Sequence, residues 1–497
     1  MKQLRASDAA APSRLRLRAQ SPLPYRERGA RTGLRILQTV LAPLVAARRK
    51  PAPTTSPGTG EVDAPRRPER ARWPRRATLA VALALACAGP SIVAAQVRHL
   101  PAGQGLGEGT RQPDDAPLPI PNAPPRLRAS SDGQPWSVRF ARSVMRRNPQ
   151  THRRWDYTQG VVLGAIERVA IARRDRAMLR YVNANMARWI TPEGDITGYA
   201  LDDHNLDEIA QGRLLFGMRE RTGDEKYVYA ANMLYEQLGK QPRTPSGGFW
   251  HKQIYPNQMW LDGLFMAAPF YAQYARRVNH PAAFDDIARQ FVLVHDRTRD
   301  PRTGLMYHAW DEAKAQPWAD SATGRSPNVW ARAMGWYMMG LVETLDQFPR
   351  DHPQRATLVR LLREAAEGVA TVQDPRTGLW WDVLDQPSRE GNYLEASASS
   401  MFAYAFARGA RMGYLDPSYR RAGERAFGGL LANLVRENPD GTASLINVVQ
   451  VSGLGGNRRS DGSYRDGSYA YYVSEPVVTD DYKGVGPFIL AALELGR

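Results

Sequence analysis

The chain has 497 residues and a formal net charge of +17, but this charge is unevenly distributed. Residues 1–95 contain 18 Lys and Arg and only 5 Asp and Glu, which leaves +4 for the other 402 residues. A near-neutral remainder has no basic stripe wide enough for a phosphate backbone, so nucleic acid is excluded as an expected partner.

The N-terminal region predicts export. Arginine-rich residues 66–76 precede an apolar run at 77–86 and then a cleavage site of small residues. This pattern is typical of a secretory signal peptide, here over residues 75–95. The apolar run is too short for a stable membrane span, and we expect a periplasmic protein cut after Ala95. The only cysteine, Cys87, lies in this segment, so a lipid anchor is an alternative and the mature chain has no disulfide.

Two further segments flank the predicted signal peptide. Residues 1–74 are rich in Arg, Pro and Ala with little periodicity, which predicts a disordered basic leader. The alternative is a start codon assigned too early, with initiation near Val62. Residues 96–135 are rich in Pro, Gly and Asp and predict a linker.

Residues 136–497 predict one helical domain in which two kinds of segment alternate. Helices that are apolar on all sides belong inside a fold, and amphipathic helices belong outside. The apolar segments are 157–171, 206–218, 259–274, 329–345, 395–411 and 482–495. The amphipathic segments are 137–147, 177–189, 225–240, 281–295, 354–372 and 417–435. Strict alternation of this kind indicates six helical hairpins.

The loops between the hairpins repeat as well. Asp300 and Asp374 each open the same sequence, Asp-Pro-Arg-Thr-Gly-Leu, and a short aromatic-rich segment follows each. An open solenoid would need a polar cap on its last helix, but segment 482–495 is as apolar as the others. Closure into a ring explains this. We therefore predict an all-α fold, an (α/α)6 barrel of six inner and six outer helices.

Asp262 is the most informative carboxylate, because it stands in the almost wholly apolar run 259–270. Apolar neighbours such as Trp260, together with a nearby Asp207, would disfavour its charge and raise its pKa above the usual value of about 3.9. A protonated Asp262 could then act as a general acid. The alternative is that Asp262 only caps its helix, and the same alternative applies to Asp207.

Other polar and aromatic side chains precede the inner helices. They would therefore converge on one mouth of the barrel, the end at which the inner helices begin. This composition is typical of a carbohydrate pocket, in which aromatic faces stack on sugar rings. Arg332 enters an apolar helix and needs an anionic partner, either a substrate carboxylate, Asp262 or Asp207. His251 and His308 either orient substrate or are satisfied loop histidines. No spacing typical of metal ligands occurs. The mouth residues are Asp202, Asp203, Asp207, His251, Lys252, Asp262, His308, Trp330, Arg332 and Trp381.

Several motifs, in order over residues 137–497, resemble the unsaturated rhamnogalacturonyl hydrolases. These enzymes form glycoside hydrolase family 105 and are related to the unsaturated glucuronyl hydrolases of family 88. The motifs are Asn205-Leu206-Asp207, Gly248-Phe249-Trp250-His251-Lys252, Gln258-Met259-Trp260-Leu261-Asp262-Gly263, Tyr307-His308-Ala309-Trp310-Asp311, Trp330-Ala331-Arg332-Ala333-Met334-Gly335-Trp336 and Asp481-Tyr482-Lys483-Gly484-Val485-Gly486-Pro487-Phe488.

The resemblance implies an (α/α)6 barrel that uses no metal and no cofactor. Its substrates would be lyase products of pectin, rhamnogalacturonan oligosaccharides that end in a 4,5-unsaturated galacturonyl residue. Asp262 would protonate C4 of the vinyl ether and help water to add at C5, while Asp207 would raise the pKa of Asp262 and orient substrate or water. Arg332 or Lys252 would hold the uronate carboxylate. The implied pocket residues are Tyr157, His251, Lys252, Trp260, His308, Trp330 and Arg332.

Three alternatives stay open on the sequence. The same chemistry could act on unsaturated glucuronyl units from ulvan, glycosaminoglycan or arabinogalactan fragments. Another sugar enzyme on this barrel, such as an epimerase or a lyase, would depend on a His or Tyr base rather than on Asp262. A non-catalytic carbohydrate-binding module would tolerate Asp262→Asn without loss of function.

Overall fold

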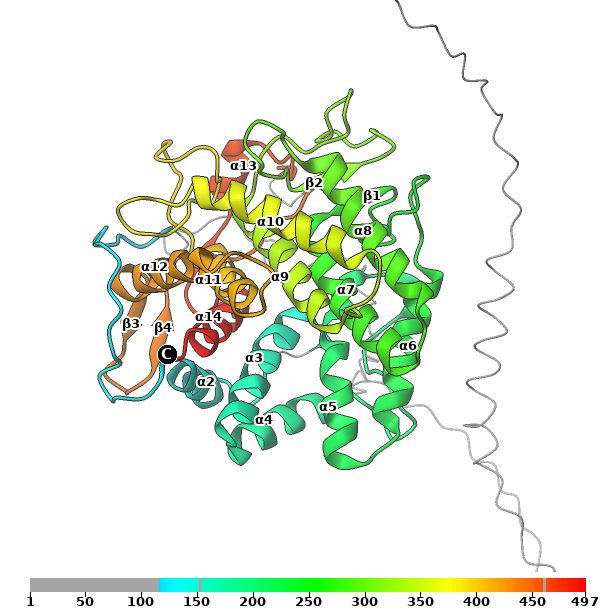
Figure 1. Ribbon diagram of the computed structural model, residues 1–497, viewed down its shortest axis with the longest axis horizontal. Coiled ribbons are helices and arrows are strands. Elements are labelled where there is room, and N and C mark those ends of the chain that lie inside the picture. The colour runs from blue at the N-terminus through cyan, green and yellow to red at the C-terminus, as the bar shows by residue number, and fades with distance from the viewer. Residues whose placement is uncertain (1–115, 152–153, 459–461) are drawn as a thin grey trace, which may run out of the picture. The chain divides into compact units, whose positions relative to one another are not determined.

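The computed structural model describes residues 116–151, 154–458 and 462–497, so the predicted leader and signal peptide lie outside the described residues. Inner and outer helices alternate along this part of the chain (Figure 1). The inner helices are α3 (Tyr157–Arg173), α5 (Arg213–Thr222), α7 (Leu261–Arg277), α9 (Ala331–Gln347), α11 (Ala396–Arg411) and α14 (Tyr482–Glu494). The outer helices are α2 (Trp136–Arg147), α4 (Arg176–Ala187), α6 (Lys226–Lys240), α8 (Ala282–Thr298), α10 (Arg355–Thr371) and α12 (Ser418–Asn433).

The inner helices form a closed ring. Each packs on the next inner helix along the chain, and the last, α14, packs on both α11 and α3. Each inner helix also packs on an outer one, α3 on α4 through α11 on α12, while α14 packs on α2. Figure 1 shows α14 between α11 and α3. The predicted all-α (α/α)6 barrel is confirmed.

Local sequence sets where the inner helices begin. The side chain of Asp156 accepts a hydrogen bond from the backbone N of Thr158 at the start of α3, at 2.8 Å. Asp481 accepts one from Lys483 at the start of α14, also at 2.8 Å. Such caps satisfy donors that have no partner within the helix. Beyond its start, α9 buries every residue from 331 to 345, as a helix of the inner ring must.

The second inner segment differs from its prediction. The sequence predicted one helix over 206–218, but Leu206–Glu208 and Ala210–Gly212 form two 3-10 turns, η3 and η4, and α5 begins only after them. Helix α3 approaches this segment closely, since a Cβ at Gly160 would stand 2.6 Å from the Cβ of Gln211. A 3-10 turn is narrower than an α-helical turn, and it therefore fits the space beside α3.

Short sheets and one short helix, α13 (Tyr469–Ser474), stand between the long helices. The first sheet pairs Trp260 with Ala309, which joins the chain before α7 to a segment that precedes α9. In the repeated turns Gly304 and Gly378 both have φ of +73°, which residues with a side chain rarely adopt. The antiparallel pairs are β1 (Gln258–Trp260) with β2 (Ala309–Asp311), β3 (Val435–Glu437) with β4 (Ala443–Leu445), and β5 (Val448–Val449) with β6 (Val477–Val478).

Residues 116–135, the described part of the predicted linker, form no helix or strand and pack along the barrel. The backbone N of Ala123 donates to Oδ1 of Asn433 at 2.7 Å. The backbone N of Arg126 donates to the carbonyl of Gly428 at 3.1 Å. This segment therefore lies against α12, as Figure 1 also shows.

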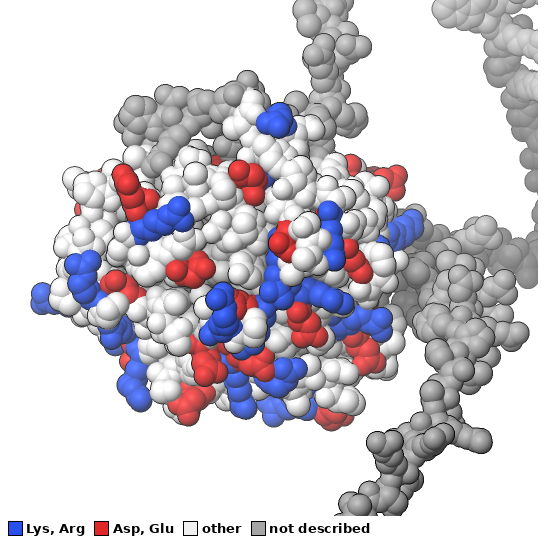
Figure 2. Space-filling model, turned by 90° about the horizontal axis from the view of Figure 1, so that it is seen from above, with Lys and Arg blue, Asp and Glu red and all other residues white. Residues whose placement is uncertain are grey.

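The described surface mixes both signs of charge. Figure 2 shows Lys and Arg interspersed with Asp and Glu on the face in view, where they form no continuous basic stripe. This distribution agrees with the near-neutral charge of residues 96–497. Among the residues that the structure describes, no helix has the length and apolar character that a membrane span needs.

An ionic cluster surrounds the buried carboxylate of Glu343 within the ring of inner helices. Arg168 of α3 and Arg213 of α5 both face Glu343 of α9, and Tyr404 of α11 donates to the same carboxylate. Burial alone would raise the pKa of Glu343, but the two guanidinium groups outweigh it and lower that pKa to about 2. The cluster therefore ties four inner helices together beside a cavity of about 270 Å³.

Ring closure leads to a prediction about Gly486 in α14. A Cβ at this position would lie 2.6 Å from Cγ1 of Val161 and 3.1 Å from its backbone oxygen, in α3. We expect Gly486→Ala to lower the free energy of unfolding by about 1–3 kcal/mol, as overpacking usually does. Urea-induced unfolding followed by circular dichroism measures this change.

The matched control is Gly164→Ala in α3, where an added Cβ meets nothing within 4 Å. Because alanine favours the helix over glycine, this variant should be more stable than wild type by about 0.5–1 kcal/mol. Equal effects of the two substitutions would contradict tight packing between α3 and α14.

Candidate active site

The N-terminal ends of the inner helices meet at one mouth of the barrel. Tyr157 lies at the start of α3. Its pKa is affected by the charges of Asp207, Arg332 and Asp481, which lie at the starts of three other inner elements. Burial first, and then Asp207, raise the pKa of Tyr157 well above its ordinary value. Because a helix N-terminus carries a partial positive charge, this mouth favours an anionic ligand.

Asp262 lies in the first turn of α7 and does not cap it. The N-cap residue is Trp260, which makes no capping hydrogen bond through its side chain. The Asp262 side chain is 13% exposed, and its Oδ2 lies 3.2 Å from Nε2 of His308. The capping interpretation of Asp262 is therefore wrong, and its carboxyl group stands where a ligand at the mouth can reach it.

Asp207 forms an ion pair with Lys252. The Nζ of Lys252 lies 2.7 Å from Oδ2 of Asp207, and Nε2 of His251 lies 3.3 Å from Oδ1. Burial alone would raise the pKa of Asp207, but the charge of Lys252 is the main cause that outweighs it and lowers that pKa. Burial would lower the pKa of Lys252, yet Asp207 raises it. Asp207 is therefore ionised and paired, and Asn205 rather than Asp207 caps η3.

His251 is buried and neutral at neutral pH. Burial is the main cause that lowers its pKa to about 4, and it outweighs the opposing charge of Asp207. The His251 ring stacks on Trp260, with centroids 4.6 Å apart and planes 10° apart. Trp260 stacks in turn on Tyr255 at 4.8 Å. These three rings, His251, Tyr255 and Trp260, form an aromatic wall, and the neutral imidazole adds no charge to the Asp207–Lys252 pair.

His308 is fully buried beneath Asp262. Its Nδ1 lies 2.8 Å from the hydroxyl of Tyr472, on α13, while its Nε2 faces Asp262. Its ring lies between Trp260 and Trp330, with centroid distances of 5.5 and 4.8 Å. His308 was predicted from the sequence as a mouth residue, and Tyr472 was not. The available signal was a tyrosine-rich run just before the closing motif.

Arg332 pairs with neither Asp262 nor Asp207. It is buried, with its guanidinium 4.9 Å from the centroid of the Trp330 ring. Its Nη1 and Nη2 donate to the backbone carbonyls of residues 449–450, at 2.6 and 3.2 Å. Asp262 and Asp207 were both expected as partners of Arg332, and both predictions are wrong. The guanidinium instead donates its hydrogen bonds to backbone carbonyls.

Buried carboxyl groups surround the base of Trp330. The hydroxyl of Ser397, 3.4 Å from Nη1 of Arg332, donates to Glu395, which caps α11. The indole of Trp330 donates to Asp382 at 3.1 Å. Burial first, and then the charge of Glu395, raise the pKa of Asp382 well above its ordinary value. The charge of Arg332 opposes this effect and favours the ionised form of Asp382.

The remaining mouth residues lie in turns and loops. Asp202 and Asp203 belong to the 3-10 turn η2 (Leu201–Asp203), and Trp381 forms an isolated bridge with Leu394. Over residues 116–151, 154–458 and 462–497, no group of three or more His, Cys, Asp or Glu side chains is arranged to hold a metal ion.

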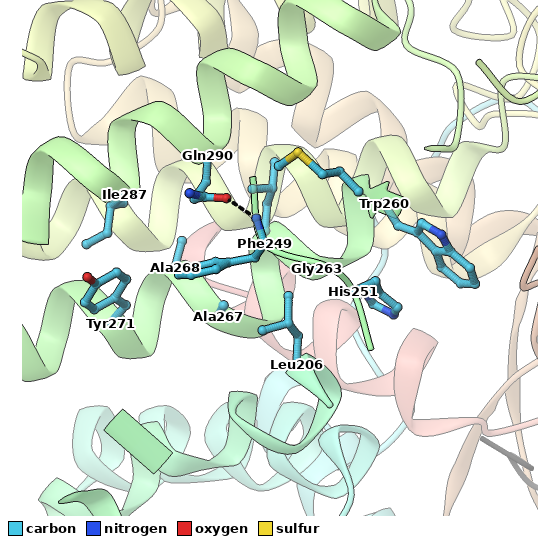
Figure 3. Close-up of a pocket in the computed structure, with 12 residues that line it drawn as sticks. Leu206, Phe249, His251, Trp260, Gly263, Ala267, Ala268, Tyr271, Ile287 and Gln290 are labelled. Atoms are coloured by element: carbon cyan, nitrogen blue, oxygen red, sulfur yellow. Dashed lines mark hydrogen bonds between the residues drawn. The ribbon is translucent and has the colours of Figure 1, made fainter. Parts of the chain in front are cut away.

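A small apolar pocket lies directly behind the aromatic wall (Figure 3). Its volume of about 20 Å³ has room for about one water molecule. Figure 3 shows His251 and Trp260 at one end, and Gln290 accepting a hydrogen bond from the backbone of Phe249 at 2.8 Å. The described residues that line it do not include Asp262. This pocket is a packing void, and a sugar has to approach Asp262 from the mouth instead.

A helical barrel with two carboxyl groups and an aromatic wall at one mouth defines a glycoside hydrolase of the helical-barrel class. The model of the family described as Glycosyl Hydrolase Family 88 matches residues 136–497, which is most of the chain. The chain therefore belongs to this family.

Solved structures and known proteins are similar to this chain. A family 105 glycoside hydrolase structure from Clostridium acetobutylicum is 41% identical with a TM-score of 0.71, covering 73% of this chain and 99% of its own. The unsaturated rhamnogalacturonyl hydrolase YesR of Bacillus subtilis is 30% identical over 268 residues, 53% of this chain and 73% of its own. Protein Atu3128 of Agrobacterium fabrum is 42% identical over 233 residues, 46% of this chain and 97% of its own. The predicted resemblance to families 105 and 88 is confirmed.

The Asp207–Lys252 pair leads to a prediction about stability. Removing one partner leaves a buried charge uncompensated, so Lys252→Met should lower the free energy of unfolding by about 3 kcal/mol at pH 7. Since the pKa of Asp207 is lowered on folding, the pair stabilises the fold above the ordinary carboxyl pKa. This stabilisation is lost as the pH falls through the lowered pKa, so the difference between wild type and variant should shrink in acid. Urea-induced unfolding at several pH values measures it.

Two controls accompany this measurement. Lys240→Met removes an exposed lysine that pairs with Glu236 at 2.7 Å, and it should leave stability unchanged. The double variant Asp207→Asn/Lys252→Met should recover part of the loss, because no charge is then left unpaired. A loss of stability that is the same at every pH would contradict the ion pair as its cause.

Proposed function

We propose that this protein removes the terminal 4,5-unsaturated galacturonyl residue from rhamnogalacturonan oligosaccharides by hydrating its vinyl ether. The observation that carries the proposal is that the two carboxyl groups at the mouth are held differently. Asp207 is paired with Lys252, whereas Asp262 lies beside His308. Displacement at an anomeric carbon uses two carboxyl groups as acid and as base or nucleophile. Hydration needs one group that gives a proton and takes one back.

In the proposed first step, the carboxyl group of Asp262 protonates C4 of the alkene. The positive charge that develops at C5 is shared with the ring oxygen. A water molecule adds at C5 and gives a proton to the Asp262 carboxylate, which restores the acid. The resulting hemiketal opens to a ketone at C5 and leaves a hemiacetal at C1, which releases the leaving sugar as an alcohol.

The other mouth residues orient the unsaturated ring. Lys252 has three donors and spends one on Asp207, so it can also hold the uronate carboxylate, which the helix N-termini favour. We assign this contact to Lys252 rather than to Arg332, because Arg332 donates to backbone carbonyls beneath Trp330. Tyr157 offers a hydroxyl group. Trp260 and Trp330 are only 6% and 2% exposed, so they leave little open face for a sugar and instead support the groups beside Asp262.

A second candidate is hydrolysis of unsaturated glucuronyl units, such as those from ulvan, glycosaminoglycan or arabinogalactan fragments. Two relatives are named unsaturated 3S-rhamnoglycuronyl hydrolase: that of Formosa agariphila is 28% identical over 177 residues, and that of an Alteromonas species is 25% identical over 228. The chemistry at Asp262 would be the same, and the leaving sugar would differ. The longer match to the rhamnogalacturonyl hydrolase of Bacillus subtilis favours the first candidate.

The test follows the ultraviolet absorbance of the alkene in a lyase-generated unsaturated rhamnogalacturonan disaccharide. We expect the absorbance to fall as rhamnose is released. Asp262→Asn should lower kcat by about 10²–10⁴-fold, because the variant cannot donate the proton. Asp285→Asn, which changes an exposed carboxylate on α8, is the matched control and should keep full activity.

Three further measurements make this test sharper. A saturated disaccharide should not be cleaved, and the product formed in deuterium oxide should carry deuterium at C4. Cleavage of the saturated disaccharide, or full activity of Asp262→Asn, would contradict vinyl ether hydration. Turnover of unsaturated glucuronyl substrates alone would replace the first candidate by the second.

We also propose that the enzyme works in the periplasm after loss of the predicted signal peptide. The support is the sequence pattern of residues 66–95, which precedes the hydrolase domain. Mass spectrometry of the protein from the periplasm of a Gram-negative host should find a mature N-terminus at Gln96. A protein that stays in the cytoplasm uncut would contradict this, and a lipid on Cys87 would establish an anchor instead.

A further inference from the structure

A chain of polar contacts runs from Tyr472 through His308 to Asp262. The hydroxyl of Tyr472 lies 2.8 Å from Nδ1 of His308, and Nε2 of His308 lies 3.2 Å from Oδ2 of Asp262. Tyr472 and His308 both have 0% of their surface exposed. Solvent therefore cannot take the place of the tyrosine hydroxyl at Nδ1.

Backbone and ring contacts hold both ends of this chain in place. The backbone N of His308 donates to the carbonyl of Asn328 at 3.3 Å, and the Asn328 side chain donates to the carbonyl of Gly467 at 2.8 Å, just before α13. The Tyr472 ring is nearly parallel to that of Trp330, with centroids 6.1 Å apart and planes 21° apart. The hydroxyl of Tyr472 is thus directed at one nitrogen of His308.

The phenol of Tyr472 keeps its proton. Burial first, and then the charge of Asp262, raise its pKa well above the ordinary value. Its hydroxyl can donate to Nδ1 of His308 or accept from it. In a neutral imidazole, only donation leaves the single ring proton on Nε2, the nitrogen that lies 3.2 Å from Oδ2 of Asp262. These two atoms are in electrostatic contact without hydrogen-bond geometry. The opposite arrangement would set the Nε2 lone pair against the lone pairs of a carboxylate.

We propose that Tyr472 is a positioning residue, whose hydroxyl donates to Nδ1 of His308 and so keeps the imidazole proton on Nε2 for the Asp262 carboxylate. The inference rests on the proposed function, in which Asp262 gives its proton to C4 and is a carboxylate until water has added. The Nε2–H group stabilises that carboxylate in the interval. No proton leaves His308 or Tyr472 in this step. Asp262 alone loses a proton to C4, and it regains one from the water that adds at C5.

Other charged and titratable groups act on this chain from the elements packed around it. They stay the same in the variants compared below, so they do not produce a difference between them. They are His251 before β1, Asp207 and Lys252 beside it, Asp382 beneath Trp330, Asp466 and Glu475 on either side of α13, and Arg332 at the start of α9.

The test compares wild type with Tyr472→Phe and Tyr471→Phe. Phenylalanine at position 472 keeps the ring against Trp330 and removes the donor. Tyr471 is the matched control, because it is buried on the same helix and its hydroxyl donates to the carbonyl of Gly453 at 2.7 Å. Removing that hydroxyl leaves Nδ1 of His308 with its own donor.

Nitrogen-15 NMR of histidine-labelled protein reads the tautomer without any need for activity. His308→Asn identifies the signal among the eight histidines of the chain. We expect His308 to carry its proton on Nε2 in wild type and in Tyr471→Phe, and to show mixed tautomers in Tyr472→Phe. An unchanged tautomer in Tyr472→Phe would overturn the proposal.

Kinetics give the second readout, on whichever unsaturated disaccharide the protein turns over. We expect Tyr472→Phe to lower kcat about tenfold, the effect of one lost hydrogen bond, with KM within about twofold of wild type. The basic limb of its pH–rate profile should move to higher pH, because the Asp262 carboxylate is no longer stabilised. An unchanged profile, or an equal loss in Tyr471→Phe, would overturn the assignment. Inactivity of wild type on every unsaturated substrate would instead overturn the proposed function, and NMR would still decide the role of Tyr472.

Discussion

A helix such as α9, which buries every residue from 331 to 345, needs to be covered on every face, and a closed ring inside a second layer does this. Each inner helix lies between two others and under an outer one, and α14 closes the ring between α11 and α3. Closure also brings the N-terminal ends of the inner helices together at one mouth of the barrel. The N-terminal ends meet where Asp207 and Asp262 stand, and the two arginines beside Glu343 lie further along the inner segments. The direction of the inner helices therefore decides which mouth attracts an anionic sugar.

Asp207 and Asp262 each lie at the start of an inner element, but the groups around them differ. Asp207 lies beside a lysine and a neutral histidine, and it is held as an anion. Asp262 lies beside an imidazole whose other nitrogen meets a tyrosine. The charge of the first is matched within the protein, which leaves the second to respond to the substrate. Neighbours, and not residue type, thus separate the two roles.

The alternation of apolar and amphipathic segments was enough to predict the barrel, because burial on all sides is a local property of each helix. The break before α5 was not predictable, since it depends on how closely α3 approaches at Gly160. The sequence placed Asp262 and His308 at one mouth from their positions before helices. The sequence could not predict the partners of Arg332, because these are backbone carbonyls 117 and 118 residues away. It could not predict the contact between Tyr472 and His308 either, because the two residues are 164 positions apart.

The order of the chain has a consequence for biosynthesis. Both aspartates, the lysine and the histidines leave the ribosome well before α13 and α14, which supply Tyr472 and the contact that closes the ring on α3. A nascent chain therefore contains every group that the proposed mechanism uses while it still lacks a closed mouth, and its inner helices stay uncovered on one side. On the proposed mechanism, catalytic competence requires that α14 has been synthesised.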